Sequence, residues 1–196
     1  MLHCSPVKGY LALLPSLLFL TLCTCARAQF PPDVKAKLGE IHYSPAVGGV
    51  LGSEEPAFEL LFEEERIESI RVGITANPDF RVVQVIEFTV RRADGSLVKR
   101  LIGGAEEADW QPVIAMPKGA TLRGISGRGG WFIDAIRFHF TDGSQSPEYG
   151  GAGGDTEFRL LLAETAERRA RGAFRGFYGT AGGLVESLGL VFWPLE

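Results

Sequence analysis

Two similar stretches of the chain decide its fold. Leu122–Phe140 reads LRGISGRGGWFIDAIRFHF, and Phe174–Phe192, 52 residues further on, reads FRGFYGTAGGLVESLGLVF. An arginine, three glycines and the final phenylalanine coincide, and Asp134 aligns with Glu186. A fainter copy ends in Val85–Val90 (VIEFTV). Because a unit of about fifty residues cannot bury its own apolar face, three such units predict a threefold arrangement of small sheets around one core.

A glycine-rich loop lies upstream of each copy. The chain contains 25 glycines without a collagen-like triplet, which is typical of the many tight turns of an all-β fold. The pairs Asp94-Gly95 and Asp142-Gly143 predict hairpin turns. The loops upstream of the three copies are Gly48-Gly49 with Gly52, then Gly103-Gly104, then Gly150–Gly154.

Short apolar runs between these breaks predict strands. One stretch disagrees: Ala163–Ala170 (AETAERRA) is rich in helix formers, yet it lies between two strand-like runs, so a short helix and a hairpin are both open. The expected strands are Phe58–Phe62, Ser69–Val72, Val82–Val90, Leu97–Ile102, Trp131–Phe140, Phe158–Leu162, Phe174–Tyr178 and Val185–Trp193.

Composition and charge narrow the class of protein. A chain of 196 residues with 45% hydrophobic and 22% charged residues can build the packed core of one domain. The net charge of −4 excludes a general basic surface for nucleic acid. We expect the acidic clusters Glu54-Glu55 and Glu63–Glu65 to be solvated faces.

Residues 1–28 are interpreted as a signal peptide. A weakly positive start at Lys8 precedes a 13-residue apolar run, Tyr10–Leu22, and Ala26–Ala28 forms a small-x-small cleavage signature. A signal anchor is the alternative, but the run is shorter than the roughly 20 residues of a membrane span. Cleavage near Ala28 would remove all three cysteines (Cys4, Cys23 and Cys25) and give a secreted chain of net charge −6.

The repeated motifs resemble those of the jacalin-related lectins. The residues that carry the resemblance are GRGGWFIDAI at 127–136, followed by YGGAGG at 149–154. The resemblance covers the chain from about Tyr43 to Trp193, so we expect a lead-in at 29–42 and a jacalin-type lectin domain at 43–196. It implies a β-prism of three four-stranded Greek-key sheets with pseudo-threefold symmetry, and strand and turn at Ala163–Ala170.

The resemblance also implies a sugar site built from two loops. In that family one loop carries a Gly-x-x-x-Asp motif and the other is a glycine loop. A carboxylate accepts two hydroxyl hydrogen bonds, backbone N–H groups donate to the sugar oxygens, and a glycine allows close approach. The plain alternative is that the acid caps a turn and the glycines only form tight loops. The expected carbohydrate-binding residues are Gly130, Trp131, Phe132, Asp134, Gly151 and Gly154.

The other two units match the pattern less well. In the third, Glu186 stands where the family has aspartate, and its extra methylene displaces the carboxylate outward. In the first, Gln84 replaces the acid and the glycine is missing, so no binding is expected there. The possible second carbohydrate site comprises Gly182, Gly183, Leu184 and Glu186 with Gly49 and Gly52.

Sugar class follows from the resemblance alone. Galactose-preferring members are cleaved at the glycine loop, and the loop at Gly150–Gly154 lies in mid-chain without an obvious processing signal, which resembles the mannose/glucose type. Trp131 either stacks on a sugar or shields the core.

Two other functions stay open. One is a protein-interaction module with decayed sugar sites. The other is an anion or sulfated-glycan binder using Arg123, Arg128 and Arg137 with Arg168, Arg169 and Arg171.

We find no sign of catalysis in the sequence. Gly-x-Ser-x-Gly, His-Glu-x-x-His and Walker patterns do not occur, and His139 lies on a strand face opposite the phenylalanines. Asp134 and Glu186 belong to different units, so they do not form a glycosidase pair. We therefore expect no enzyme, no metal and no cofactor. The expected partners are glycans, with no nucleic acid, no stable membrane span and possible homo-oligomers.

Overall fold

The computed structural model describes residues 41–49, 57–62, 64–162 and 173–193, and these form three antiparallel sheets. The first sheet combines both ends of the described chain, in the order β1-β14-β13-β3, with β2 also pairing with β14. Its strands are β1 (His42–Tyr43), β2 (Val47–Gly48), β3 (Ala57–Leu61), β13 (Ala173–Ala181) and β14 (Val185–Trp193).

The other two sheets are contiguous in sequence. One has the order β6-β5-β4-β7, with β8 also on β4, and the other has the order β11-β10-β9-β12. The former contains β4 (Arg66–Ile74), β5 (Val83–Arg91), β6 (Leu97–Gly103), β7 (Asp109–Trp110) and β8 (Ile114–Ala115). The latter contains β9 (Leu122–Gly129), β10 (Ile133–Phe140), β11 (Tyr149–Gly150) and β12 (Thr156–Leu161).

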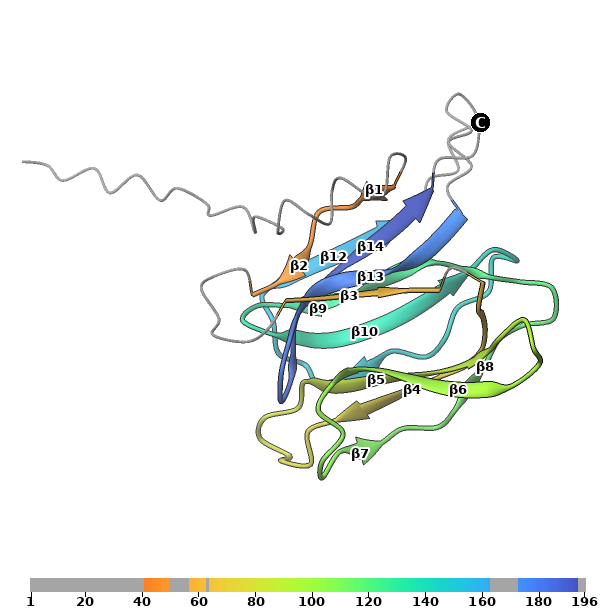
Figure 1. Ribbon diagram of the computed structural model, residues 1–196. Helices are drawn as coiled ribbons and strands as arrows, with labels where there is room; N and C mark the ends of the chain where they lie inside the picture. Colours follow the sequence, from red (N-terminus) through yellow and green to blue (C-terminus); the bar gives the residue numbers. More distant parts are fainter. Residues whose placement is uncertain (1–40, 50–56, 63, 163–172, 194–196) are drawn as a thin grey trace, which may run out of the picture.

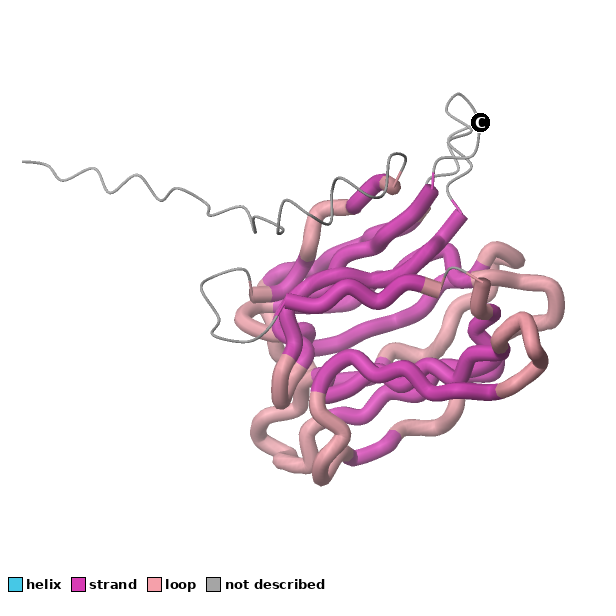
Figure 2. Tube along the Cα trace, viewed as in Figure 1, coloured by secondary structure: helices cyan, strands magenta, loops and turns pink. Residues whose placement is uncertain are grey.

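Each sheet therefore has four strand positions. In the first sheet β1 and β2 are two pieces of one outer strand on β14, and in the second β7 and β8 are two pieces of one outer strand on β4. Figure 1 shows the sheet of β13 and β14 (blue) above the sheet of β4–β6 (yellow to green). The described residues form strands and loops without a helix (Figure 2), so they contain no helix that could cross a membrane.

The core lies where the three sheets face one another. The strands β5, β10 and β14, one from each sheet, contact one another pairwise. Phe88 on β5 stacks on Phe177 of β13 at 5.3 Å between ring centroids, and Phe138 on β10 is fully buried beside other apolar side chains. Burial of large apolar side chains from all three units is the stabilisation that a single unit of fifty residues cannot supply.

All eight expected strands are confirmed. The long strand β9 was missed, as were the two-residue strands β1, β2, β7, β8 and β11. The predicted runs between Phe58 and Trp193 overlap β3, β4, β5, β6, β10, β12, β13 and β14. The strand β9 was not predicted because its glycines weaken a strand pattern. Those glycines are required by close backbone contact: a Cβ on Gly127 would lie 1.9 Å from the carbonyl oxygen of Ala135. Ala163–Ala170 lies outside the described residues, as do residues 1–28.

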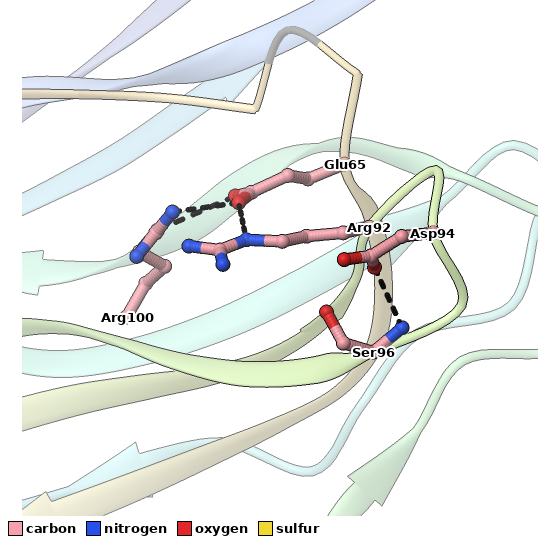
Figure 3. Close-up of polar contacts among 5 residues, drawn as sticks. All are labelled: Glu65, Arg92, Asp94, Ser96 and Arg100. Carbon is pink, nitrogen blue, oxygen red and sulfur yellow. Dashed lines mark hydrogen bonds and ion pairs between the residues drawn. The ribbon is translucent and has the colours of Figure 1, made fainter.

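The expectation that Glu63–Glu65 is a solvated face is wrong for Glu65. Its carboxylate accepts hydrogen bonds from Arg92 Nε at 3.3 Å and from Arg100 Nη2 at 2.6 Å (Figure 3). In the same hairpin the Ser96 N–H donates to Asp94 Oδ1 at 2.8 Å (Figure 3), and Gly95 has φ +85°. The Glu65 side chain, 13% exposed, thus ties the start of β4 to the β5–β6 hairpin.

We expect Glu65→Gln to lower the free energy of unfolding by about 1 kcal/mol, because a neutral amide cannot replace the three charge-assisted hydrogen bonds that Arg92 and Arg100 donate to this mostly buried carboxylate. Urea denaturation measures the change. The neighbouring Glu64→Gln, at an exposed position, is the matched control and should leave the urea midpoint unaltered. Equal midpoints for the two variants would contradict the role given to Glu65.

Candidate functional site

The three repeat units place their acid position in the same structural feature, a β-bulge. Asp134 is the extra residue between the pairs Ile133–Gly129 and Ala135–Arg128. Glu186 and Gln84 are the extra residues at the corresponding places of β14 and β5. A bulge leaves its extra residue outside the ladder and redirects its side chain. The alignment of Asp134 with Glu186 is therefore confirmed, and the fainter first copy is confirmed with it.

Each bulge is bound by the glycine loop of its own unit. The N–H of Gly151 donates to the carbonyl oxygen of Asp134 at 2.9 Å, and the N–H of Gly49 donates to that of Glu186 at 2.9 Å. A Cβ on Gly103 would lie 2.1 Å from the carbonyl oxygen of Gln84. The third unit is therefore closed by the N-terminal strands β1 and β2.

The three bulge loops also contact neighbouring units. They lie between β4 and β5, between β9 and β10, and between β13 and β14, all at one end of the molecule (left in Figure 1). A Cβ on Gly151 would lie 2.2 Å from the carbonyl oxygen of Arg81, one on Gly49 2.2 Å from that of Trp131, and one on Gly104 3.1 Å from that of Gly183. Every glycine loop therefore touches the bulge loop of a neighbouring unit.

The glycine loop at Gly150–Gly154 packs directly on the Asp134 carboxylate. A Cβ on Gly153 would lie 2.4 Å from Asp134 Oδ1, and one on Gly154 would lie 2.8 Å from Oδ2 and 2.9 Å from the backbone nitrogen of Gly129. Gly154 also has φ +74°, which side chains rarely adopt. Backbone approaches the two carboxylate oxygens this closely only because these positions lack side chains.

The carboxylate of Asp134 is partly buried, and its ionised form lowers the stability of the fold. Burial raises its pKa, and the nearby Asp155 carboxylate adds to the rise, while Arg128 and the backbone N–H of Gly130 oppose it. A carboxyl group with a raised pKa in the folded state is one whose ionised form destabilises the fold at neutral pH. Such a cost is typical of functional positions.

Arg128 fixes the glycine loop in place. Its guanidinium donates to the carbonyl oxygen of Gly151 at 2.8 Å and to that of Ala152 at 3.2 Å. From the sequence, Arg128 was given a role only in the anion-binding alternative. Its position in β9, six residues before Asp134, was visible, but its contact with a loop more than twenty residues away was not.

Aromatic side chains surround the Asp134 loop. Trp131 is 86% exposed at the tip of the loop, and Phe132 packs edge-to-face on Phe80, with ring centroids 5.7 Å apart and an interplanar angle of 85°. Phe80 is itself 42% exposed and belongs to the loop between β4 and β5. This third loop was missed, because the first unit lacks the motif glycine and was set aside as a site.

The other two bulge sites differ in their side chains. The Gln84 amide donates to the carbonyl oxygen of Glu106 in its own unit. In the third unit Glu186 Oε2 is shielded from solvent and has no hydrogen-bond partner among the described residues. Leu184 and Gly183 form the tip of that loop, after Gly182, whose N–H donates to the carbonyl oxygen of Leu184 at 3.1 Å. Gly52, the last residue expected there, lies outside the described residues.

Sequence comparison finds no relative for the chain: no protein-family model matches it, and no curated protein matches it. Solved structures do resemble it. The agglutinin of Calystegia sepium is 19% identical with a TM-score of 0.61, over 79% of this chain and 97% of that chain. AcmJRL, a mannose-binding jacalin-related lectin from Ananas comosus, is 20% identical with a TM-score of 0.57, over 79% and 99%. Artocarpin, solved in a mannotriose complex, is 15% identical with a TM-score of 0.58, over 78% and 97%.

The three sheets and their equivalent bulges define the protein as a β-prism of pseudo-threefold symmetry, as the sequence predicted. The particular form of that prism is the fold of the jacalin-related lectins.

Proposed function

We propose that the protein is a secreted, non-catalytic lectin that binds a mannose- or glucose-type sugar at Asp134. The observation that carries the proposal is the contact between the glycine-loop backbone and the partly buried Asp134 carboxylate. Similar structures include a lectin described as mannose-binding and one solved with mannotriose, which supports the sugar class. Secretion rests on the signal-peptide pattern of residues 1–28.

The arrangement suits a pyranose with two neighbouring free hydroxyls. The carboxylate of Asp134 accepts from both hydroxyls, and the backbone N–H groups of Trp131, Phe132 and Gly154 donate to sugar oxygens. A shallow site making four or five hydrogen bonds to a well-hydrated sugar gives a Kd on the order of millimolar for a monosaccharide. Several sites, through oligomers or clustered glycans, then supply avidity.

Saturation-transfer NMR with methyl α-mannoside and methyl α-galactoside tests the proposal. We expect transfer from the protein to the mannoside, with little to the galactoside. Transfer to the galactoside alone would overturn the sugar class. Transfer to neither sugar would favour the protein-interaction module. Only one of the three bulges carries an aspartate, and Gln84 is hydrogen-bonded within its own unit, which a module with decayed sugar sites would explain.

Sugar affinity should fall as the pH is lowered. The fall should begin at a higher pH than it would for an aspartate with an ordinary pKa. Hydroxyls donate to the ionised carboxylate, so the sugar binds the charged form and affinity decreases about tenfold per pH unit below the pKa of free Asp134. Because burial raises that pKa, the decline begins at a higher pH. Asp155→Asn removes a charge that raises the pKa of Asp134, so it should move the decline to lower pH. Affinity for methyl α-mannoside measured against pH in both proteins checks this, and overlapping profiles would contradict it.

Trp131 is expected to contribute to oligosaccharide binding. The ring is 86% exposed beside the acid loop and can stack on the apolar face of a sugar unit next to the one at Asp134. We expect Trp131→Ala to weaken mannotriose binding about threefold to tenfold. Methyl α-mannoside affinity and the thermal midpoint should change little, because the side chain buries almost no surface. Equal losses for both sugars would instead indicate that the substitution distorts the loop.

A further inference from the structure

The outer face of the β9–β10–β12 sheet carries a row of cationic side chains. Arg137 on β10 and Arg159 on β12 are both in register with Ser126 on the central strand β9. Neighbouring strands of a sheet lie about 4.8 Å apart, so the two arginines flank the small serine side chain with Cβ atoms about 10 Å apart. Two arginine side chains at this separation can both reach a group seated over the serine.

The acidic side chains of this face gather at the next row. Glu157 is in register with Arg128, and Glu148 lies 3.6 Å from Arg128 Nη2 and 3.8 Å from Arg137 Nη2. Arg159 is exposed, and the described residues give its guanidinium no ion pair or hydrogen bond. The Nε of Arg137 is shielded from solvent and lacks a hydrogen-bond partner among the described residues. Positive charge at the Ser126 row is therefore only partly compensated.

His139 lies in the same region of excess positive charge. Its Nε2 lies 2.7 Å from Ser126 Oγ, and its ring is partly buried on the same face. Burial lowers the pKa of His139, and Arg159, Arg137 and Arg123 lower it further. When His139 Nε2 donates to Ser126 Oγ, the serine hydroxyl is free to donate outward.

We propose that Arg137, Ser126 and Arg159 form a binding site for a tetrahedral oxyanion, the sulfate or phosphate ester of a glycan. The planar guanidinium forks present paired N–H donors that match the oxygens of such a group, and Ser126 supplies a hydroxyl between them. The proposal narrows the anion or sulfated-glycan alternative of the sequence to a defined row on one sheet, since Arg168, Arg169 and Arg171 lie outside the described residues. It rests on Arg159, which the sequence did not single out.

This site is separate from the sugar site. Asp134 and Arg137 are three residues apart along β10, which is about 10 Å of extended strand. The two sites can therefore be removed independently, and a charged oligosaccharide of two or more units is long enough to reach both. Failure of one site in an experiment says nothing against the other.

A titration of the protein with sodium sulfate, at ionic strength held constant with sodium chloride, tests the proposal. We expect saturable NMR shifts of the Ser126 and Arg159 amides and a rise in the pKa of His139, because a bound anion favours the imidazolium. Arg159→Gln should weaken sulfate binding at least about fivefold, a discounted value for a charge-assisted hydrogen bond at an exposed site. Arg66→Gln is the matched control, because it removes the same charge from an exposed arginine on another sheet and should leave sulfate binding intact.

The source of the anion is distinguished with glucose 6-sulfate and glucose 6-phosphate, titrated into Asp134→Asn so that the neutral sugar site does not contribute. Binding of the sulfate ester, the phosphate ester or both, weakened at least about fivefold in Arg159→Gln, supports the site and identifies its ligand. If Arg159→Gln and Arg66→Gln weaken anion binding equally, the effect comes from net charge alone and the proposal is overturned. Shifts that follow sodium chloride as closely as sodium sulfate would overturn it as well.

Discussion

Replacing Asp134 with asparagine should abolish detectable methyl α-mannoside binding without destabilising the protein. The amide keeps the shape of the side chain but offers one acceptor in place of a carboxylate, and hydrogen bonds to a charged group are worth about 1.5–3 kcal/mol each. The Kd expected for the parent protein is already millimolar. Losing one such hydrogen bond and weakening the other would raise the Kd beyond the measurable range. Because burial raises the pKa of Asp134, the neutral amide should leave the free energy of unfolding equal or slightly higher.

Asp155→Asn is the matched control for this substitution. It removes an identical charge from the loop next to the glycines, at an exposed residue that has no assigned role in binding. We expect it to retain methyl α-mannoside binding at neutral pH. Isothermal calorimetry and urea denaturation of both variants provide the comparison. An Asp134→Asn protein that binds the mannoside as tightly as the parent would move the site away from this loop.

Replacing Gly154 with alanine should remove sugar binding and destabilise the fold together. The new Cβ would lie 2.8 Å from Asp134 Oδ2 and 2.9 Å from the Gly129 backbone nitrogen, at a residue with φ +74°. The carboxylate can move away but the backbone of β9 cannot do so cheaply, so we expect a loss of about 2–3 kcal/mol in the free energy of unfolding. Displacement of either the loop or the carboxylate separates the groups that bind the sugar.

Gly143→Ala separates backbone strain from steric clash. Gly143 also has positive φ, +87°, but an added Cβ there meets nothing within 4 Å, and the residue lies in the turn after β10. We expect a loss of about 1 kcal/mol with sugar affinity unchanged. Gly154→Ala behaving like Gly143→Ala in both assays would mean that the close approach at Asp134 is unimportant.

The fold was predictable because it rests on a repeat. The alignment of Asp134 with Glu186 required only the printed sequence, and the structure places both in equivalent bulges. The strand β9 was not assigned because Gly124, Gly127 and Gly129 weaken its local pattern. Those glycines serve contacts with β10 and β12, which are properties of the folded sheet rather than of the strand alone.

The site was only partly predictable, because one of the loops that form it belongs to the first unit, far from the acid loop in the sequence. The acid loop and the glycine loop follow from motifs. Phe80 and the Arg81 carbonyl reach the site from the first unit, whose motif is degenerate, and nothing local in the sequence marks them. Glu65 was misread for the same reason: its two arginine partners lie 27 and 35 residues away.

The most direct test of the central claim is a map of backbone amide shifts as methyl α-mannoside is added to the ¹⁵N-labelled protein. We expect the perturbed amides to cluster at Trp131, Phe132 and Gly154, with weaker changes at Gly130 and Gly151. Changes confined to the loop around Glu186 would transfer binding to the third unit. Perturbations absent from the Asp134 loop at saturating sugar would contradict the account.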